Sequence, residues 1–96
     1  MQVKEKVIVV TGAASGIGKA LCERFAIEGA SAIVATDINS EGVNATVSDI
    51  SDQSQALGIT CDVGKEGEAT ELVAKTLEAF GHIDLFCSNA GIFTPG

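Results

Sequence analysis

Short apolar runs alternate along the chain with longer segments in which apolar residues recur every three or four positions. The short runs are typical of buried strands, and the longer periodic segments are typical of amphipathic helices. Four strands are predicted, at Val7–Thr11, Ala32–Asp37, Leu57–Cys61 and Ile83–Cys87. Three helices are predicted, over residues 16–28, 41–50 and 65–80. Because strands that alternate with helices form βαβ units, the pattern predicts an α/β fold with a parallel sheet.

The helix boundaries and faces follow from particular residues. Gly29 and Gly81 follow the first and third helices, and Asn39 with Ser40 can cap the second. Helix propensity is low in the second helix because of Gly42, Val43, Thr46 and Val47. The first helix is expected to face the core with Ile17, Leu21 and Phe25. The third is expected to do so with Ala69, Leu72, Val73, Leu77 and Phe80.

Length and charge narrow the classes of function. The 96 residues suffice for one small domain with one core. Thirteen acidic residues against six Lys and Arg leave a net charge of −7. Nucleic-acid backbones and anionic lipid surfaces both select positive charge, so neither is expected as a partner.

The N-terminus and the cysteines bear on location and metal binding. The apolar run 7–10 is far too short for a signal peptide or a membrane span. Cys22, Cys61 and Cys87 form no CxxC motif and no Cys/His cluster, so no metal site is predicted. Each lies in an apolar stretch, which predicts buried free thiols in a reducing cytoplasm.

The segment Thr11–Gly18, with the sequence TGAASGIG, joins the first strand to the first helix. Its three glycines permit a tight turn and the close approach of a ligand to the backbone. The N-terminus of the following helix presents free N–H groups and a partial positive charge, which suit a pyrophosphate. The spacing G-x-x-x-G-x-G differs from the G-x-G-x-x-G dinucleotide fingerprint, and a purely structural turn is the alternative.

Polar residues follow the other strands. Asp37 ends the second strand, where a carboxylate can accept hydrogen bonds from both ribose hydroxyls of an adenosine and repel a 2′-phosphate. Asp62 follows the third strand and can either accept from an exocyclic amine or cap the helix that starts near Lys65. The segment 89–91 follows the fourth strand. Open α/β sheets bind ligands at this carboxyl edge.

These motifs, in this order and spacing, resemble the short-chain dehydrogenase/reductase family over essentially the whole chain. The resemblance implies a Rossmann-like three-layer fold with an incomplete parallel sheet of strand order 3-2-1-4. It implies NAD as the cofactor, preferred over NADP because of Asp37. The residues implied to bind the pyrophosphate are Gly12, Ser15, Gly16, Ile17 and Gly18. The residues implied to bind the adenosine and the central ribose are Asp37, Asp62, Val63, Asn89, Ala90 and Gly91, with a sheet-holding role as the alternative for Asn89.

One departure from the family is as informative as the match. The family moves a hydride between nicotinamide and an alcohol or carbonyl carbon, with a Tyr-x-x-x-Lys pair and an upstream Ser. The sequence contains no tyrosine. Residues 1–96 are therefore expected to be the N-terminal part of a single dinucleotide-binding domain, truncated before the catalytic segment and inactive alone. No catalytic residue is assigned, and the lone His82 is expected to be a loop residue.

Two other functions and one partner are also considered. The chain could be a standalone nucleotide-binding or association module without catalysis. It could also belong to a methyltransferase with an adenosyl cofactor, although Thr11–Gly12 and Asn89–Gly91 speak against that. The fourth strand is expected to leave an unpaired apolar edge at 85–87, so a homo-oligomer through that edge or through exposed helix faces is predicted.

Overall fold

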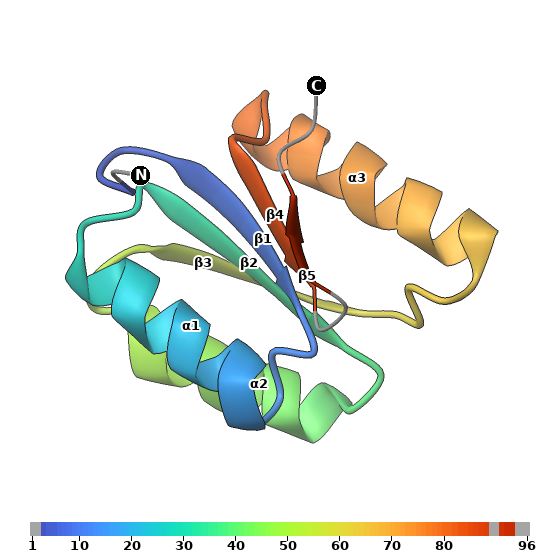
Figure 1. The fold of residues 1–96 in the computed structure, drawn as a ribbon, viewed down its shortest axis with the longest axis horizontal. Coiled ribbons are helices and arrows are strands. Elements are labelled where there is room, and N and C mark those ends of the chain that lie inside the picture. The colour runs from blue at the N-terminus through green and yellow to red at the C-terminus, as the bar shows by residue number, and fades with distance from the viewer. Residues whose placement is uncertain (1–2, 89–90, 94–96) are drawn as a thin grey trace.

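The computed structural model describes residues 3–88 and 91–93, and it alternates strands and helices as the sequence pattern predicts (Figure 1). The first half contains β1 (Val7–Thr11), α1 (Gly16–Ile27), β2 (Ala32–Asp37) and α2 (Ser40–Ile50). The second half contains β3 (Gln55–Thr60), α3 (Glu66–Phe80), β4 (Leu85–Ser88) and β5 (Gly91–Phe93). Within this part of the chain, no helix combines the length and apolar character needed to cross a membrane.

The sheet has the strand order β3-β2-β1-β4-β5, and its first four strands are parallel. Val9 in β1 lies opposite Val34 on one side and Phe86 on the other. Helices α1 and α2 cover one face of the sheet, and α3 covers the other (Figure 1). The predicted three-layer α/β fold with the order 3-2-1-4 is therefore confirmed.

Alternate residues of the central strands build two separate cores. Ile8 and Ile33 point toward the layer of α1 and α2, and they pack in one cluster with Cys22, Ala26 and Ile50. Val9 and Val34 point the other way and pack with Leu72. All five residues of β1 are buried, because helices cover both faces of the sheet.

The helix ends follow the predicted signals to within a residue. The Asn39 side chain accepts a hydrogen bond from the Gly42 N–H at 3.1 Å and caps α2. Gly29 and Gly81 follow α1 and α3 with positive φ angles of 92° and 85°. These local signals act through the unpaired backbone groups at helix ends, which explains why sequence alone locates them.

The two predicted helix faces are confirmed in part, since Leu21 and Phe25 of α1 pack against one core and Leu72 of α3 is buried in the other, but each face needs one correction. Ile17 is 77% exposed, whereas Gly18, Cys22 and Ala26 form the buried face of α1. The first turn of α1 packs against the backbone of the preceding loop, and only a residue as small as Gly18 fits there. In α3, Leu77 is 43% exposed and the neighbouring Thr76 is buried instead.

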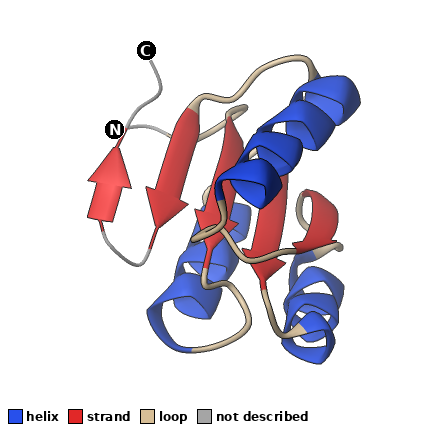
Figure 2. Ribbon diagram, turned by 90° about the vertical axis from the view of Figure 1, so that its right-hand side faces the viewer, coloured by secondary structure: helices blue, strands red, loops and turns tan. Residues whose placement is uncertain are grey.

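The predicted strands at the sheet edges are also partly wrong. Strand β3 begins at Gln55, earlier than predicted, because its parallel pairing with β2 reaches from Ala32 to Asp37. Strand β4 runs over Leu85–Ser88 rather than Ile83–Cys87. The predicted unpaired edge of the fourth strand is wrong, because β5 pairs with it in antiparallel orientation. In Figure 2, the arrow of β5 at the sheet edge runs opposite to its neighbour. A strand of three residues leaves too short a pattern to detect in the sequence.

Candidate functional site

The loop between β1 and α1, residues 12–15, is shaped by close backbone contact. Gly12 and Gly16 adopt positive φ angles of 66° and 61°, a conformation that favours glycine. At position 18, a Cβ atom would lie 2.0 Å from the carbonyl oxygen of Gly12. The glycines predicted from the sequence therefore have separate tasks: the first two turn the chain, and Gly18 lets α1 approach the loop.

The end of β2 holds this loop in place. The Ala13 N–H donates to the Thr36 carbonyl oxygen at 3.0 Å, and the Ala14 N–H donates to Oδ2 of Asp37 at 3.1 Å. The other carboxylate oxygen of Asp37 accepts from the Asn39 N–H at 3.1 Å. A carboxylate has about four lone-pair directions, so Asp37 keeps acceptor capacity for a ligand. Asp37 therefore has a structural role in this turn, and its binding role stays a prediction.

Helix α2 approaches the same loop from the other side. The Thr46 hydroxyl donates to the Ala13 carbonyl oxygen at 2.7 Å. A Cβ atom on Gly42 would lie 2.4 Å from the Cβ of Ala14. The sequence analysis did not assign Gly42 and Thr46 to the site and treated them only as poor helix formers. Their low helix propensity could have indicated this contact, because residues that are unfavourable in a helix often occur where a tertiary contact requires them.

A cavity of about 490 Å³ opens beside the loop, at the carboxyl ends of the strands. The residues that line it are Thr11, Gly12, Thr36, Asp37, Ile38, Cys61, Asp62, Val63, Gly64 and Ser88. They come from the ends of β1, β2 and β4 and from the turn after β3. Strand β1 is also where the chain order of the sheet reverses, the position at which open α/β sheets bind ligands.

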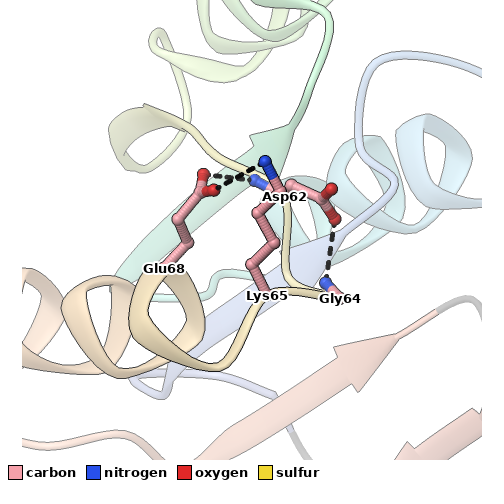
Figure 3. Close-up of polar contacts among 4 residues, drawn as sticks. All are labelled: Asp62, Gly64, Lys65 and Glu68. Carbon is pink, nitrogen blue, oxygen red and sulfur yellow. Dashed lines mark hydrogen bonds and ion pairs between the residues drawn. The ribbon is translucent and has the colours of Figure 1, made fainter.

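Asp62 lines this cavity and is held by contacts within the turn after β3, which Figure 3 shows. Its Oδ1 accepts from the Gly64 N–H at 2.9 Å, and its N–H donates to Oε1 of Glu68 at 2.8 Å. The Lys65 ammonium lies 3.8 Å from Oε2 of Glu68. The alternative that Asp62 caps α3 is wrong, because the N-cap position is Lys65 and the Asp62 side chain bonds within its own turn. Glu68, which orders this turn from α3, was missed by sequence reasoning.

The predicted binding residues fall into three groups. Gly12, Asp37, Asp62 and Val63 line the cavity together. The other predicted pyrophosphate residues, at the N-terminus of α1, are not among those that line it: Ser15, Gly16, Ile17 and Gly18. Asn89 and Ala90 lie outside the described residues, and Gly91 is the first residue of β5, opposite Ser88.

The charges of the site favour a ligand with hydroxyl or amine donors at one end and an anion at the other. Asp37 and Asp62 place two carboxylates at the cavity, and no Lys or Arg is among the described residues that line it. At the α1 N-terminus, the described side chains provide no cap: Ser15 is exposed and makes no cap hydrogen bond. The first N–H groups of α1 and its dipole are thus available to an anion.

The cysteines and the histidine contribute differently. Burial raises the pKa of Cys22 to about 12 and raises the pKa of Cys87 as well, so both thiols stay protonated in the core. Cys61 is only half-buried, which corrects the expectation that all three are buried, and its Sγ lies 3.3 Å from Oγ1 of Thr36. His82 lies in a loop, as expected, with Nε2 2.9 Å from Oδ2 of Asp84. Within the described residues, no three His, Cys, Asp or Glu gather as a metal site.

Comparison with known proteins identifies the family. A sequence model of the short chain dehydrogenase family matches residues 6–96. A subunit of the (2S)-[(R)-hydroxy(phenyl)methyl]succinyl-CoA dehydrogenase of Thauera aromatica is 40% identical over 97 residues, covering 100% of this chain and 39% of the relative. Levodione reductase of Leifsonia aquatica is 37% identical over 91 residues, covering 92% of this chain and 34% of the relative.

Solved structures of dehydrogenases also match the fold of this chain. A short chain dehydrogenase/reductase of Burkholderia phymatum in complex with NAD matches with a TM-score of 0.84 at 31% identity, covering 90% of this chain and 31% of that one. A hydroxysteroid dehydrogenase of Escherichia coli matches with a TM-score of 0.82 at 34% identity, covering 88% of this chain and 35% of that one. The chain thus spans well under half the length of these proteins. Its sequence and its fold show that the chain belongs to the short chain dehydrogenase family of oxidoreductases.

Proposed function

We propose that this chain binds the adenosine and pyrophosphate parts of NAD for hydride transfer between nicotinamide and an alcohol or carbonyl carbon. The observation that carries the proposal is the position of Asp37. Its carboxylate ends β2, lines the cavity, and bonds to the loop that leads into the N-terminus of α1. Asp37 thereby connects the proposed ribose site to the loop before α1, where the pyrophosphate is proposed to bind.

The residues divide this task by their chemistry. The N–H groups at the start of α1, with Gly12, Ser15, Gly16, Ile17 and Gly18, would hold the pyrophosphate. Asp37 would accept from the ribose hydroxyls, and Asp62 with Val63 would flank the adenine. Asn89, Ala90 and Gly91 would line the central ribose region. The close approach of Gly18 to Gly12 supports this fit, because it lets α1 begin immediately beside the loop that borders the cavity.

A preference for NAD over NADP is part of the proposal. A 2′-phosphate would bring a second negative group against Asp37, and no Lys or Arg among the described cavity residues would offset it. The presence of NAD in the complex of the Burkholderia phymatum relative supports a dinucleotide of this class.

The proposal assigns residues 1–96 to the cofactor-binding part of one domain. The tyrosine of the family's catalytic pair has no counterpart among them, so they are expected to show no dehydrogenase activity alone. The free thiols of Cys22, Cys61 and Cys87 support a cytoplasmic location. Association of copies stays a prediction, now through exposed helix residues such as Leu77 instead of the β4 edge.

The test is a titration of the ¹⁵N-labelled chain with NAD and with NADP, followed by amide chemical shifts. We expect NAD to bind weakly, in the range above micromolar, and at least about tenfold more tightly than NADP. Asp37→Asn should bring the two affinities close together, because it removes the repelling charge. Asp52→Asn, the matched control at an exposed position, should leave the preference unchanged. Equal binding of both cofactors, or binding of neither, would overturn the proposal.

A further inference from the structure

The loop that leads into α1 is held from three directions at Ala13 and Ala14. The end of β2 accepts both N–H groups, through the Thr36 carbonyl and the Asp37 carboxylate. The third contact comes from α2, where the Thr46 hydroxyl donates to the Ala13 carbonyl oxygen at 2.7 Å. Thr46 is fully buried, so water does not compete for the hydrogen bond of this hydroxyl.

The α2 contact has a different effect from the two contacts of β2. The N–H groups of Ala13 and Ala14 tie the loop to the sheet, while the Ala13 carbonyl ties the same loop to α2. Gly42, one helical turn before Thr46, brings α2 so close that Ala14 contacts its backbone. Helix α2 thus determines both the distance of the loop and the direction of its carbonyl.

We propose that Thr46 is a positioning residue for the cofactor loop, which orients the N-terminus of α1 toward the pyrophosphate without touching the ligand. This role rests on the proposed function for the ligand, and it names a determinant of the site outside its lining. A loop that is ordered before binding loses less conformational entropy when the ligand binds. Preordering of the loop therefore raises the affinity for the ligand.

Three variants isolate the hydroxyl. Thr46→Val keeps the shape of the side chain and leaves the Ala13 carbonyl without its partner. Thr46→Ser keeps the hydroxyl. Thr76→Val is the matched control, because Thr76 is equally buried and its hydroxyl also donates to a backbone carbonyl, that of Leu72, at 2.8 Å in α3.

The first measurement is amide hydrogen exchange without ligand. Thr46→Val should raise the exchange rates of Ala13 and Ala14 about tenfold, and Thr46→Ser should restore them. Thr76→Val should leave both rates unchanged. Unchanged rates in Thr46→Val, or an equal rise in Thr76→Val, would overturn the positioning role.

The second measurement is the NAD titration. Thr46→Val should weaken NAD binding about tenfold, with rescue by Thr46→Ser and no change in Thr76→Val. Binding of NAD that is equally strong in wild type and Thr46→Val would overturn the inference and leave the proposed function intact. If wild type itself binds no NAD, the proposed function fails, and the exchange rates still decide whether Thr46 holds the loop.

A third measurement needs no variant, in case Thr46→Val fails to fold. Coupling between two sites is reciprocal, so NAD should slow exchange at Ala13, Ala14 and the Thr46 hydroxyl of the unchanged chain. Protection limited to cavity residues, with none at these three groups, would contradict the inference.

Discussion

Gly18 lies so close to the carbonyl of Gly12 that a Cβ at position 18 would come within 2.0 Å of that oxygen. It would also come within 2.6 Å of the Gly12 carbonyl carbon, so the clash is with backbone that no rotation of a side chain relieves. The contact explains how α1 can start immediately beside the loop, whose Gly12 lines the cavity.

Gly18→Ala should therefore destabilise the chain, although alanine favours helices. Overpacking of this kind costs about 1–3 kcal/mol, which should lower the melting temperature by several degrees in thermal unfolding followed by circular dichroism. Gly67→Ala is the control: it is also a helical glycine, and nothing lies within 4 Å of its added Cβ. That variant should be stabilised by about 0.5 kcal/mol. A Gly18→Ala chain as stable as Gly67→Ala would contradict the close contact.

Asp84 couples stability to pH through the start of β1. Its Oδ2 accepts the Val7 N–H at 2.8 Å, and this bond, with a further contribution from His82, lowers the pKa of the carboxyl below its ordinary value of 3.8. The stabilisation is complete above the ordinary value and is lost as pH falls through the lower folded value. The free energy of unfolding should therefore rise with pH in this acidic range.

Denaturant unfolding at several pH values measures this dependence. Asp84→Asn keeps an acceptor for Val7 without titrating, so in the acidic range below the ordinary carboxyl value of 3.8 its stability should rise less steeply with pH than that of wild type. Asp52→Asn, exposed and outside such contacts, should keep the wild-type slope. The link between Asp84 and Val7 is wrong if both variants show the same slope.

Cys61 should be the first thiol to react with iodoacetamide near pH 8. It lines the cavity, whereas Cys22 and Cys87 are buried and have raised pKa values, so little of their thiolate forms. Mass spectrometry of the labelled peptides should show a single fast site, which Cys61→Ser removes. NAD should slow the reaction, because it would occupy the same cavity. Labelling of Cys22 as fast as Cys61 would argue against the core position of α1.

Much of the fold could be predicted from the sequence because its signals are local. The buried run at β1, the cap at Asn39 and the glycine at position 81 each act within a few residues. The parallel orientation of the first four strands follows from the alternation of strands and helices with right-handed crossovers, whereas their order in the sheet was implied by the family resemblance. The site residues at the ends of β1, β2 and β3 could be predicted for the same reason, since parallel strands end at one edge.

Other features depend on contacts between segments far apart in the chain. Gly42 and Thr46 look unfavourable in a helix, and only their contacts with Ala14 and Ala13 explain them. The bond from the Asp62 N–H to Glu68 and the antiparallel pairing of β5 with β4 join residues that are near in the chain, but no sequence pattern predicted either contact.

The sequence by itself indicated the family and the parallel α/β core, because periodicity and glycine spacing are properties of neighbouring residues. It also named four of the residues that line the cavity, Gly12, Asp37, Asp62 and Val63. Only the tertiary structure decided which residues support the loop and what each carboxylate bonds to. Asp37 shows the difference: its place at the end of β2 is readable from the sequence, whereas its bond to the Ala14 N–H depends on how two segments pack. Hydrogen bonds and close packing act at distances of a few ångströms in space, whatever the separation along the chain.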